Sequence, residues 1–169
     1  MSSKNVFHSR LDDSDSISDI FELVKDAVRI SIKKSRSGLM LGITELGSNS
    51  NGFVGAFYPV GSNIIIMNKT PLRRIQETNP SLYKPYVFHV LLHEYLHTLG
   101  ILDEKVVRFM STEISKRIFG ESHIATQMSL DFSGFIPNTT YAGLDFEQPK
   151  TGEIELVDNF DKSNVTYIA

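Results

Sequence analysis

The chain of 169 residues contains no cysteine. Without thiols it forms no disulfide, no cysteine-ligated structural zinc site, and none of the thiolate-ligated sites of zinc deaminases or deformylases. It also lacks an apolar signal core at its N-terminus and any apolar run of membrane-spanning length. These absences exclude several classes of metal site, and we expect a cytoplasmic protein with no membrane partner.

An excess of basic charge is missing as well. The chain has 17 Lys and Arg against 20 Asp and Glu, a net charge of -3 and a pI near 5.9. Apart from the run at residues 33–36, its basic residues are scattered, so it has no electrostatic footprint for a phosphate backbone. We therefore expect no nucleic-acid partner.

The most informative motif is the run His93-Glu94-Tyr95-Leu96-His97. Side chains four residues apart on a helix share a face, so the imidazoles of His93 and His97 point the same way with the Glu94 carboxylate beside them. Imidazole nitrogens are standard ligands of Zn²⁺, and three protein ligands leave a fourth position for water. A neighbouring carboxylate that is not a ligand can take the proton of that water. The motif predicts metal ligation by His93 and His97 and catalysis by Glu94; the alternative is a surface helix with two solvated histidines.

The residues around the motif predict an enclosed helix over 86–99. Apolar residues lie on more than one of its faces, which indicates burial on all sides; they are Val87, Val90, Leu91, Leu96 and Leu99. Gly100 is a typical left-handed stop. His89 continues the stripe of His93 and His97, where it either supports the site or is a partly exposed neighbour, and we favour a structural role.

The run from His93 to Asp103, HEYLHTLGILD, resembles the extended zinc signature of the metzincin metallopeptidases, HExxHxxGxxH. An aspartate at its last position is also the pattern of the snapalysin-type enzymes. The resemblance implies a zincin-like fold, a sharp turn at Gly100, and Asp103 as the third ligand of a catalytic Zn²⁺.

The residues alone do not identify the third metal ligand. Asp103 begins a segment with helical spacing that lasts until Gly120, so its carboxylate is also suited to cap that helix. In that case Glu104 or Glu113 is a candidate, because a glutamate on a second helix completes the site in gluzincin peptidases. His123 is a further candidate.

Metzincins also place a methionine in a tight turn beneath the metal. Met128 stands at a suitable distance along the chain for that role. The alternative is that Met128 fills a gap in the core, as lone methionines usually do.

The rest of the chain predicts an α+β fold with a small, mostly antiparallel sheet. A helix over 17–34, capped by Ser14 or Ser16, precedes strands at 38–46, 53–60 and 64–67. Residues 52–58 are the expected edge strand, which either binds extended substrate as an added strand or is an ordinary edge.

We expect residues 1–130 to form a zincin-like catalytic domain and residues 131–169 an extended C-terminal arm or tail of the same domain. Short strand-like pieces at 153–157 and 164–168 suggest that the arm pairs somewhere. Such an arm either lies across the cleft as an autoinhibitor, pairs with a neighbour, or is disordered.

Three functional classes follow from these observations. The leading one is a zinc-dependent peptidase acting on a peptide or protein substrate, for which Tyr95, Tyr141 and Arg108 are conceivable donors to the oxyanion. The second is a metal-dependent hydrolase of another substrate, like the ribosome-maturation proteins, whose HxxxHxxGxxH motif lacks the glutamate. The third is a non-catalytic module in which zinc staples the fold.

Overall fold

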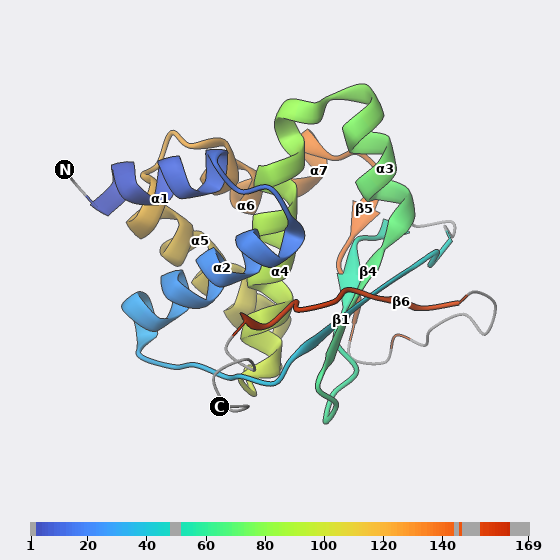
Figure 1. Ribbon diagram of the computed structural model, residues 1–169. Coiled ribbons are helices and arrows are strands. Elements are labelled where there is room, and N and C mark those ends of the chain that lie inside the picture. Colours follow the sequence, from blue (N-terminus) through green and yellow to red (C-terminus); the bar gives the residue numbers. More distant parts are fainter. Residues whose placement is uncertain (1–2, 48–51, 144–145, 147–152, 163–169) are drawn as a thin grey trace.

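The computed structural model describes residues 3–47, 52–143, 146 and 153–162 (Figure 1). Over these residues the chain has an α+β fold of seven α-helices and a small mixed sheet. The helices are α1 (Ser3–Asp12), α2 (Ile17–Ile32), α3 (Lys69–Thr78), the 3₁₀ helix η1 (Pro80–Leu82), α4 (Tyr83–Thr98), α5 (Glu104–Phe119), α6 (Ile124–Leu130) and α7 (Phe132–Phe135). The strands are β1 (Met40–Thr44), β2 (Phe53–Val54), β3 (Ala56–Phe57), β4 (Ile64–Asn68), β5 (Thr139–Thr140) and β6 (Glu155–Leu156).

The main sheet has the strand order β3-β4-β1-β6. Its central pair, β1 and β4, is parallel, with Met40 opposite Ile64 and Thr44 opposite Asn68. The expectation of a mostly antiparallel sheet is therefore wrong for this pair. The chain reaches β4 through β3, which forms an antiparallel pair with β4 on the side away from β1, and this return strand lets β4 run in the same direction as β1. A second, two-stranded sheet pairs β2 with β5 in parallel.

Helix α2 confirms the predicted helix after residue 16. The Ser16 side chain accepts a hydrogen bond from the backbone N–H of Asp19, which satisfies one of the free donors of the first turn. The helix ends at Lys33, which takes a left-handed conformation with φ 59°. Its buried face packs on α4.

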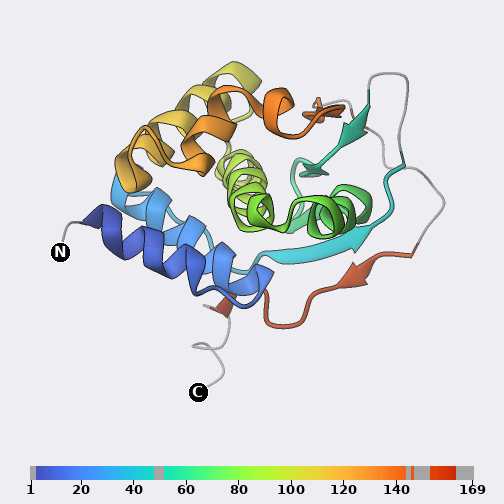
Figure 2. The same ribbon diagram turned by 90° about the horizontal axis from the view of Figure 1, so that it is seen from above.

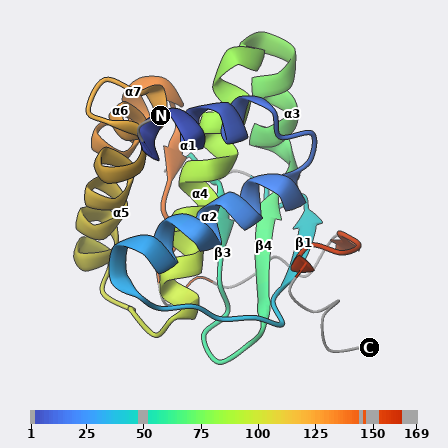
Figure 3. The same cartoon turned by 60° about the vertical axis from the view of Figure 1, so that its left-hand side comes forward.

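Helix α4 is the centre of the molecule. Viewed from above, it lies between α1, α2 and α5 on one side and the strands on the other (Figure 2). The view of Figure 3 shows the same arrangement, with α5 and α6 opposite β3, β4 and β1. Every residue from Pro85 to Thr98 is buried, so the predicted enclosed helix is confirmed and the surface-helix alternative for His93 and His97 is wrong.

The described part of the C-terminal arm packs on the domain. Strand β6, within the strand-like piece predicted at 153–157, pairs antiparallel with β1. Beyond it, the Phe160 ring stacks on Phe21 with ring centroids 4.1 Å apart, and Asp161 is buried against Lys25. The other strand-like piece, 164–168, lies outside the described residues.

Helices α1, α3, α6 and α7 have no counterpart in the sequence predictions. Helix α1 carries Phe7 and Leu11 as its buried apolar side chains, too few to give a periodic signal. Helix α3 begins directly after β4, where the Asn68 side chain accepts a hydrogen bond from Thr70 N, and it tolerates Pro71 because proline is compatible with a first helical turn. Across the described ranges, no helix combines the length and apolarity needed to cross a bilayer.

The ion pair between Lys25 and Asp161 predicts a measurable stability loss. Lys25 Nζ lies 2.6 Å from Asp161 Oδ1, and the Asp161 side chain is fully buried. Removing one partner of a buried pair costs about 3–5 kcal/mol, and we expect Asp161→Ala to reach the lower end because Lys25 also contacts Glu22. Urea unfolding measures this change. The exposed Asp158→Ala serves as the control, with a change within about 0.5 kcal/mol, and equal stabilities of the two variants would contradict the assignment.

Candidate metal centre

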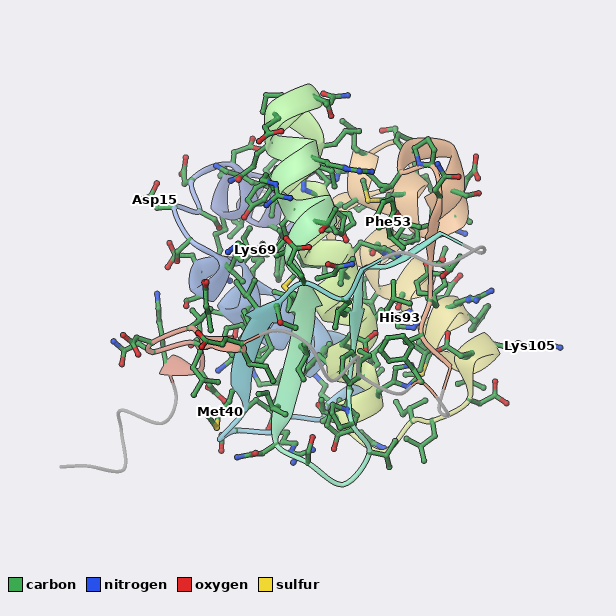
Figure 4. All side chains as sticks on the ribbon, turned by 90° about the vertical axis from the view of Figure 1, so that its right-hand side faces the viewer. Asp15, Met40, Phe53, Lys69, His93 and Lys105 are labelled. Atoms are coloured by element: carbon green, nitrogen blue, oxygen red, sulfur yellow. The ribbon has the colours of Figure 1, made fainter. Side chains whose placement is uncertain are left out.

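Three side chains from two consecutive helices converge beside α4. His93 and His97 come from α4, and Glu104 is the first residue of α5. Each offers one ligand atom, and these atoms lie within 4.8 Å of one another. In the view of Figure 4, His93 lies below Phe53 and on the inner side of Lys105, which belongs to the first turn of α5. The two imidazoles therefore share a face, as the spacing predicted.

The short connection between the helices positions the carboxylate. Gly100 has φ 93°, a conformation that an L side chain rarely adopts, and it ends α4. Asp103 then caps α5, its Oδ1 accepting from the backbone N–H groups of Lys105 and Val106. Because α5 starts so soon after α4 ends, the side chain of Glu104 reaches back to the histidines.

The surroundings of His97 indicate a cation. Its Nδ1 lies 2.8 Å from the Ile101 carbonyl oxygen, and its Nε2 lies 2.7 Å from Glu104 Oε1. Both ring nitrogens thus face acceptors, but a neutral imidazole carries only one proton. The second contact needs either a further proton, giving an imidazolium, or a metal ion on Nε2.

The spacing of the three side chains also suits Zn²⁺. His93 Nε2 lies 3.2 Å from both oxygens of Glu104. Ligand atoms about 2.0–2.1 Å from a tetrahedral zinc lie roughly 3.3 Å apart. A small opening of the cluster would accommodate such an ion, and two nitrogens with one carboxylate oxygen are a donor set that also occurs at catalytic zinc. The hydrogen bond from Nδ1 to Ile101 would leave the Nε2 lone pair of His97 available.

Glu94 lies beside this cluster and is not part of it. Its side chain is buried, with an exposed fraction of 4%, and it forms no hydrogen bond or ion pair with the other described residues. Burial raises the pKa of Glu94 to about 8; the charge of Glu104 adds to the rise and that of His97 opposes it. A carboxyl whose pKa lies near neutrality is suited to accept and return a proton.

The electrostatics of the cluster centre on Glu104. Burial opposes its ionisation, but the hydrogen bonds from His93 and His97 lower the pKa of Glu104 to about 2. Burial lowers the pKa of His93, whereas the pKa of His97 is raised, because its contact with Glu104 outweighs burial. The carboxylate is therefore anionic across the physiological range and attracts a cation.

The structure does not bring Asp103 into the cluster. Its carboxylate is exposed and is used to cap α5, the alternative role that the helical spacing after it had suggested. Glu113 lies on an exposed part of α5 beside Lys116, with 3.7 Å between Glu113 Oε1 and Lys116 Nζ. His123 caps α6 and stacks on Phe119. Among the four sequence candidates for the third ligand, Glu104 is the one that reaches His93 and His97.

Met128 does not lie in a turn. It is part of α6, and its side chain is fully buried in the core. The expected turn role is therefore wrong and the core-filling alternative is confirmed, because residues 124–130 form a helix that the sequence prediction did not include.

Three further predicted side chains occupy distinct places. The Tyr95 hydroxyl accepts from Arg36 N, away from the cluster. Tyr141 stacks on His93, with centroids 4.3 Å apart, and its hydroxyl lies 2.8 Å from His89 Nε2. Arg108 lies over Tyr141 and 3.7 Å from Glu104 Oε2. Tyr141 belongs to a segment 52 residues beyond His89, so no local pattern signals this contact.

Comparison of the chain with protein-family models, with curated proteins and with solved structures finds no match. The resemblance to zinc peptidases thus rests on the motif, residues 93–103.

The contact between His97 and Glu104 predicts a pH-dependent stability in the metal-free protein. The raised pKa of His97 stabilises the fold fully below pH 6.5, and this contribution is lost as the pH rises through the folded value. The lowered pKa of Glu104 stabilises the fold above pH 4.5, and this contribution is lost toward pH 2. Glu104→Gln should therefore destabilise the protein most between pH 4.5 and 6.5 and less at pH 8.

Urea unfolding over this pH range and NMR titration of the His97 ring test the prediction. Glu104→Gln should lower the pKa of His97, whereas the exposed Asp103→Asn should leave it in place. A His97 titration that is identical in wild type and Glu104→Gln would contradict the contact.

Proposed function

We propose that the protein is a zinc-dependent peptidase with a zincin-like fold, in which His93, His97 and Glu104 hold the metal and Glu94 is the general base. The observation that carries the proposal is the convergence of two imidazoles and a carboxylate from the next helix beside a buried carboxyl outside the cluster. This ligand set is that of the gluzincin alternative, with a glutamate in place of Asp103.

Bound zinc would supply Lewis acidity, which makes water a nucleophile near neutral pH and polarises a peptide carbonyl. The residues of the chain would do the rest. Glu104 and the two imidazoles leave one tetrahedral position for water or substrate. Glu94 would take the proton from the attacking water on its carboxylate and pass it to the departing amine. Its burial keeps competing water away and holds its pKa near the range that this transfer needs.

The placement of the strands supports an extended peptide as substrate. Strand β3 ends the described main sheet, and an edge strand can pair with a peptide through backbone hydrogen bonds. Within the expected substrate-binding segment 52–58, β2 is paired with β5. The proposed docking edge therefore narrows to Ala56 and Phe57.

The buried Glu94 favours catalysis over a zinc staple. A structural zinc site is closed by four protein ligands, whereas the described cluster supplies three. Burying a carboxyl group that binds no metal costs free energy, and a role in proton transfer would account for its retention. Glu94 also argues against a hydrolase of the ribosome-maturation type, because the HxxxHxxGxxH motif of those proteins has no glutamate at this position.

Glu94→Gln separates zinc binding from catalysis. The amide cannot accept the proton from water, so we expect cleavage of an unstructured protein substrate to fall by about 10²–10⁴-fold while zinc stoichiometry remains that of wild type. His97→Ala should lose both zinc and activity. The exposed Glu121→Gln is the matched control and should change neither. Wild-type turnover by Glu94→Gln would remove the general base from the proposal.

The third ligand is tested by a second pair of variants. Glu104→Gln should weaken zinc binding by more than about 100-fold, since it removes a ligand and not merely a group that supports one. Asp103→Asn should keep wild-type affinity, because asparagine also caps a helix. Competition with a chromophoric chelator measures both affinities. The opposite ranking would assign the third ligand to Asp103.

A further inference from the structure

The two histidines of the cluster are oriented by different means. The ring of His97 is fixed from behind by the hydrogen bond between its Nδ1 and the Ile101 carbonyl oxygen. His93 has no equivalent, because its Nδ1 is buried without a hydrogen-bond partner among the described residues. Metal-ligating imidazoles usually donate their second nitrogen to a partner that sets the ring plane. His93 therefore needs another source of orientation.

The ring of Tyr141 supplies a flat surface against His93. Their centroids lie 4.3 Å apart with an angle of only 16° between the planes, a stacked arrangement. On the same ring of Tyr141, the Arg108 guanidinium lies 4.5 Å from the centroid. Tyr141 is thus held between the proposed ligand and a cation, and stacking of this kind is worth about 0.5–1.5 kcal/mol beyond area burial.

A buried histidine holds the hydroxyl of Tyr141. The hydroxyl lies 2.8 Å from Nε2 of His89, whose side chain is 1% exposed. His89 lies one helical turn before His93 on α4. The hydrogen bond therefore connects the segment around β5 to the same rigid helix that presents the proposed ligands.

We propose that Tyr141 is a positioning residue, tethered by His89, that orients His93 for metal binding by stacking in place of a hydrogen bond. The inference rests on the proposed zinc site and extends it to a residue outside the motif. It also gives His89 a defined role: His89 binds no metal but anchors the side chain that fixes a ligand. Ligand geometry must be held within about 10–20° for tight binding, and a flat contact restricts rotation of the ring out of its plane.

A different reading makes Tyr141 an obstacle. Strand β5 runs beside β2, and farther along the chain Phe146 packs on Phe57, with centroids 4.8 Å apart. Phe57 belongs to the proposed docking edge, so the alternative role of Tyr141 and Phe146 is to block substrate. The two readings predict opposite effects of removing the ring of Tyr141: weaker metal binding if it positions His93, and faster cleavage with unchanged metal binding if it blocks the site.

The test compares zinc affinities of full-length variants by chelator competition. Tyr141→Leu removes the stack and should bind zinc about 10–100-fold more weakly than wild type. Tyr141→Phe keeps the stack and loses one hydrogen bond, worth about 1 kcal/mol, so its affinity should fall by no more than about fivefold. The visible spectrum of the Co²⁺-substituted protein should change in Tyr141→Leu and stay close to wild type in Tyr141→Phe.

Tyr83→Leu is the matched control. Tyr83 is half-buried at the start of the same helix and lines a different cavity, with His8 and His123, so its replacement should leave zinc affinity unchanged. Thermal unfolding of the metal-free variants checks that each is folded. Wild-type affinity in folded Tyr141→Leu would overturn the inference, as would a gain in peptidase activity at unchanged affinity. A wild-type protein that binds no zinc would instead overturn the proposed function, and this inference with it.

A double-mutant cycle tests the tether without removing the stack. His89→Leu and Tyr141→Phe each remove the same hydrogen bond, so the two together should weaken zinc binding no more than either alone. Fully additive losses would show that His89 and Tyr141 act independently, and would overturn the tether even if Tyr141→Leu failed to fold.

Discussion

The contact between His97 and Glu104 is the constraint on which the rest of the site depends. It joins the end of α4 to the start of α5 across a connection with left-handed Gly100 at its bend. Because both nitrogens of His97 face acceptors, the contact is favourable only with an additional positive charge on the ring or bound to it. The local structure between the two helices therefore favours a positive charge at this point, and the proposed metal ion would supply one that does not depend on protonation of His97.

The burial of α4 explains why the polar side chains of the site contact one another. Because helices and a sheet surround α4, its polar side chains depend mainly on partners within the protein. His89 forms a hydrogen bond with Tyr141, and His97 forms hydrogen bonds with Ile101 and Glu104. His93 contacts Glu104 through one ring nitrogen only. Glu94 forms no hydrogen bond with the other described residues, and the proposed proton transfer would account for this.

The sequence predicted those parts of the fold that local spacing determines. Helix α2, the enclosed α4, its end at Gly100 and the helical segment up to Gly120 all follow from apolar period and capping residues. The parallel pairing of β1 and β4 does not follow from local spacing, because it depends on which edge of β4 pairs with β3. Helix α6 was missed as well, and with it the core position of Met128.

Of the candidate site, the sequence predicted the pair of histidines but neither the third ligand nor the contact with Tyr141. The spacing of His93 and His97 fixes their common face, whereas the choice between Asp103 and Glu104 depends on whether residue 103 caps the next helix or continues the turn. Whether Asp103 or Glu104 faces the histidines depends on the direction of α5 relative to α4, and tertiary packing determines that direction. The stack of Tyr141 on His93 joins residues 48 positions apart, so no single-sequence pattern encodes it.

A crystal of the protein grown with zinc, with diffraction collected on both sides of the zinc absorption edge, tests the central claim most directly. We expect one anomalous peak bonded to His93 Nε2, His97 Nε2 and a carboxylate oxygen of Glu104, with Glu94 close to the fourth position and outside bonding distance. A map without a peak at this cluster, or with a peak bonded to Asp103 while Glu104 points away, would contradict it.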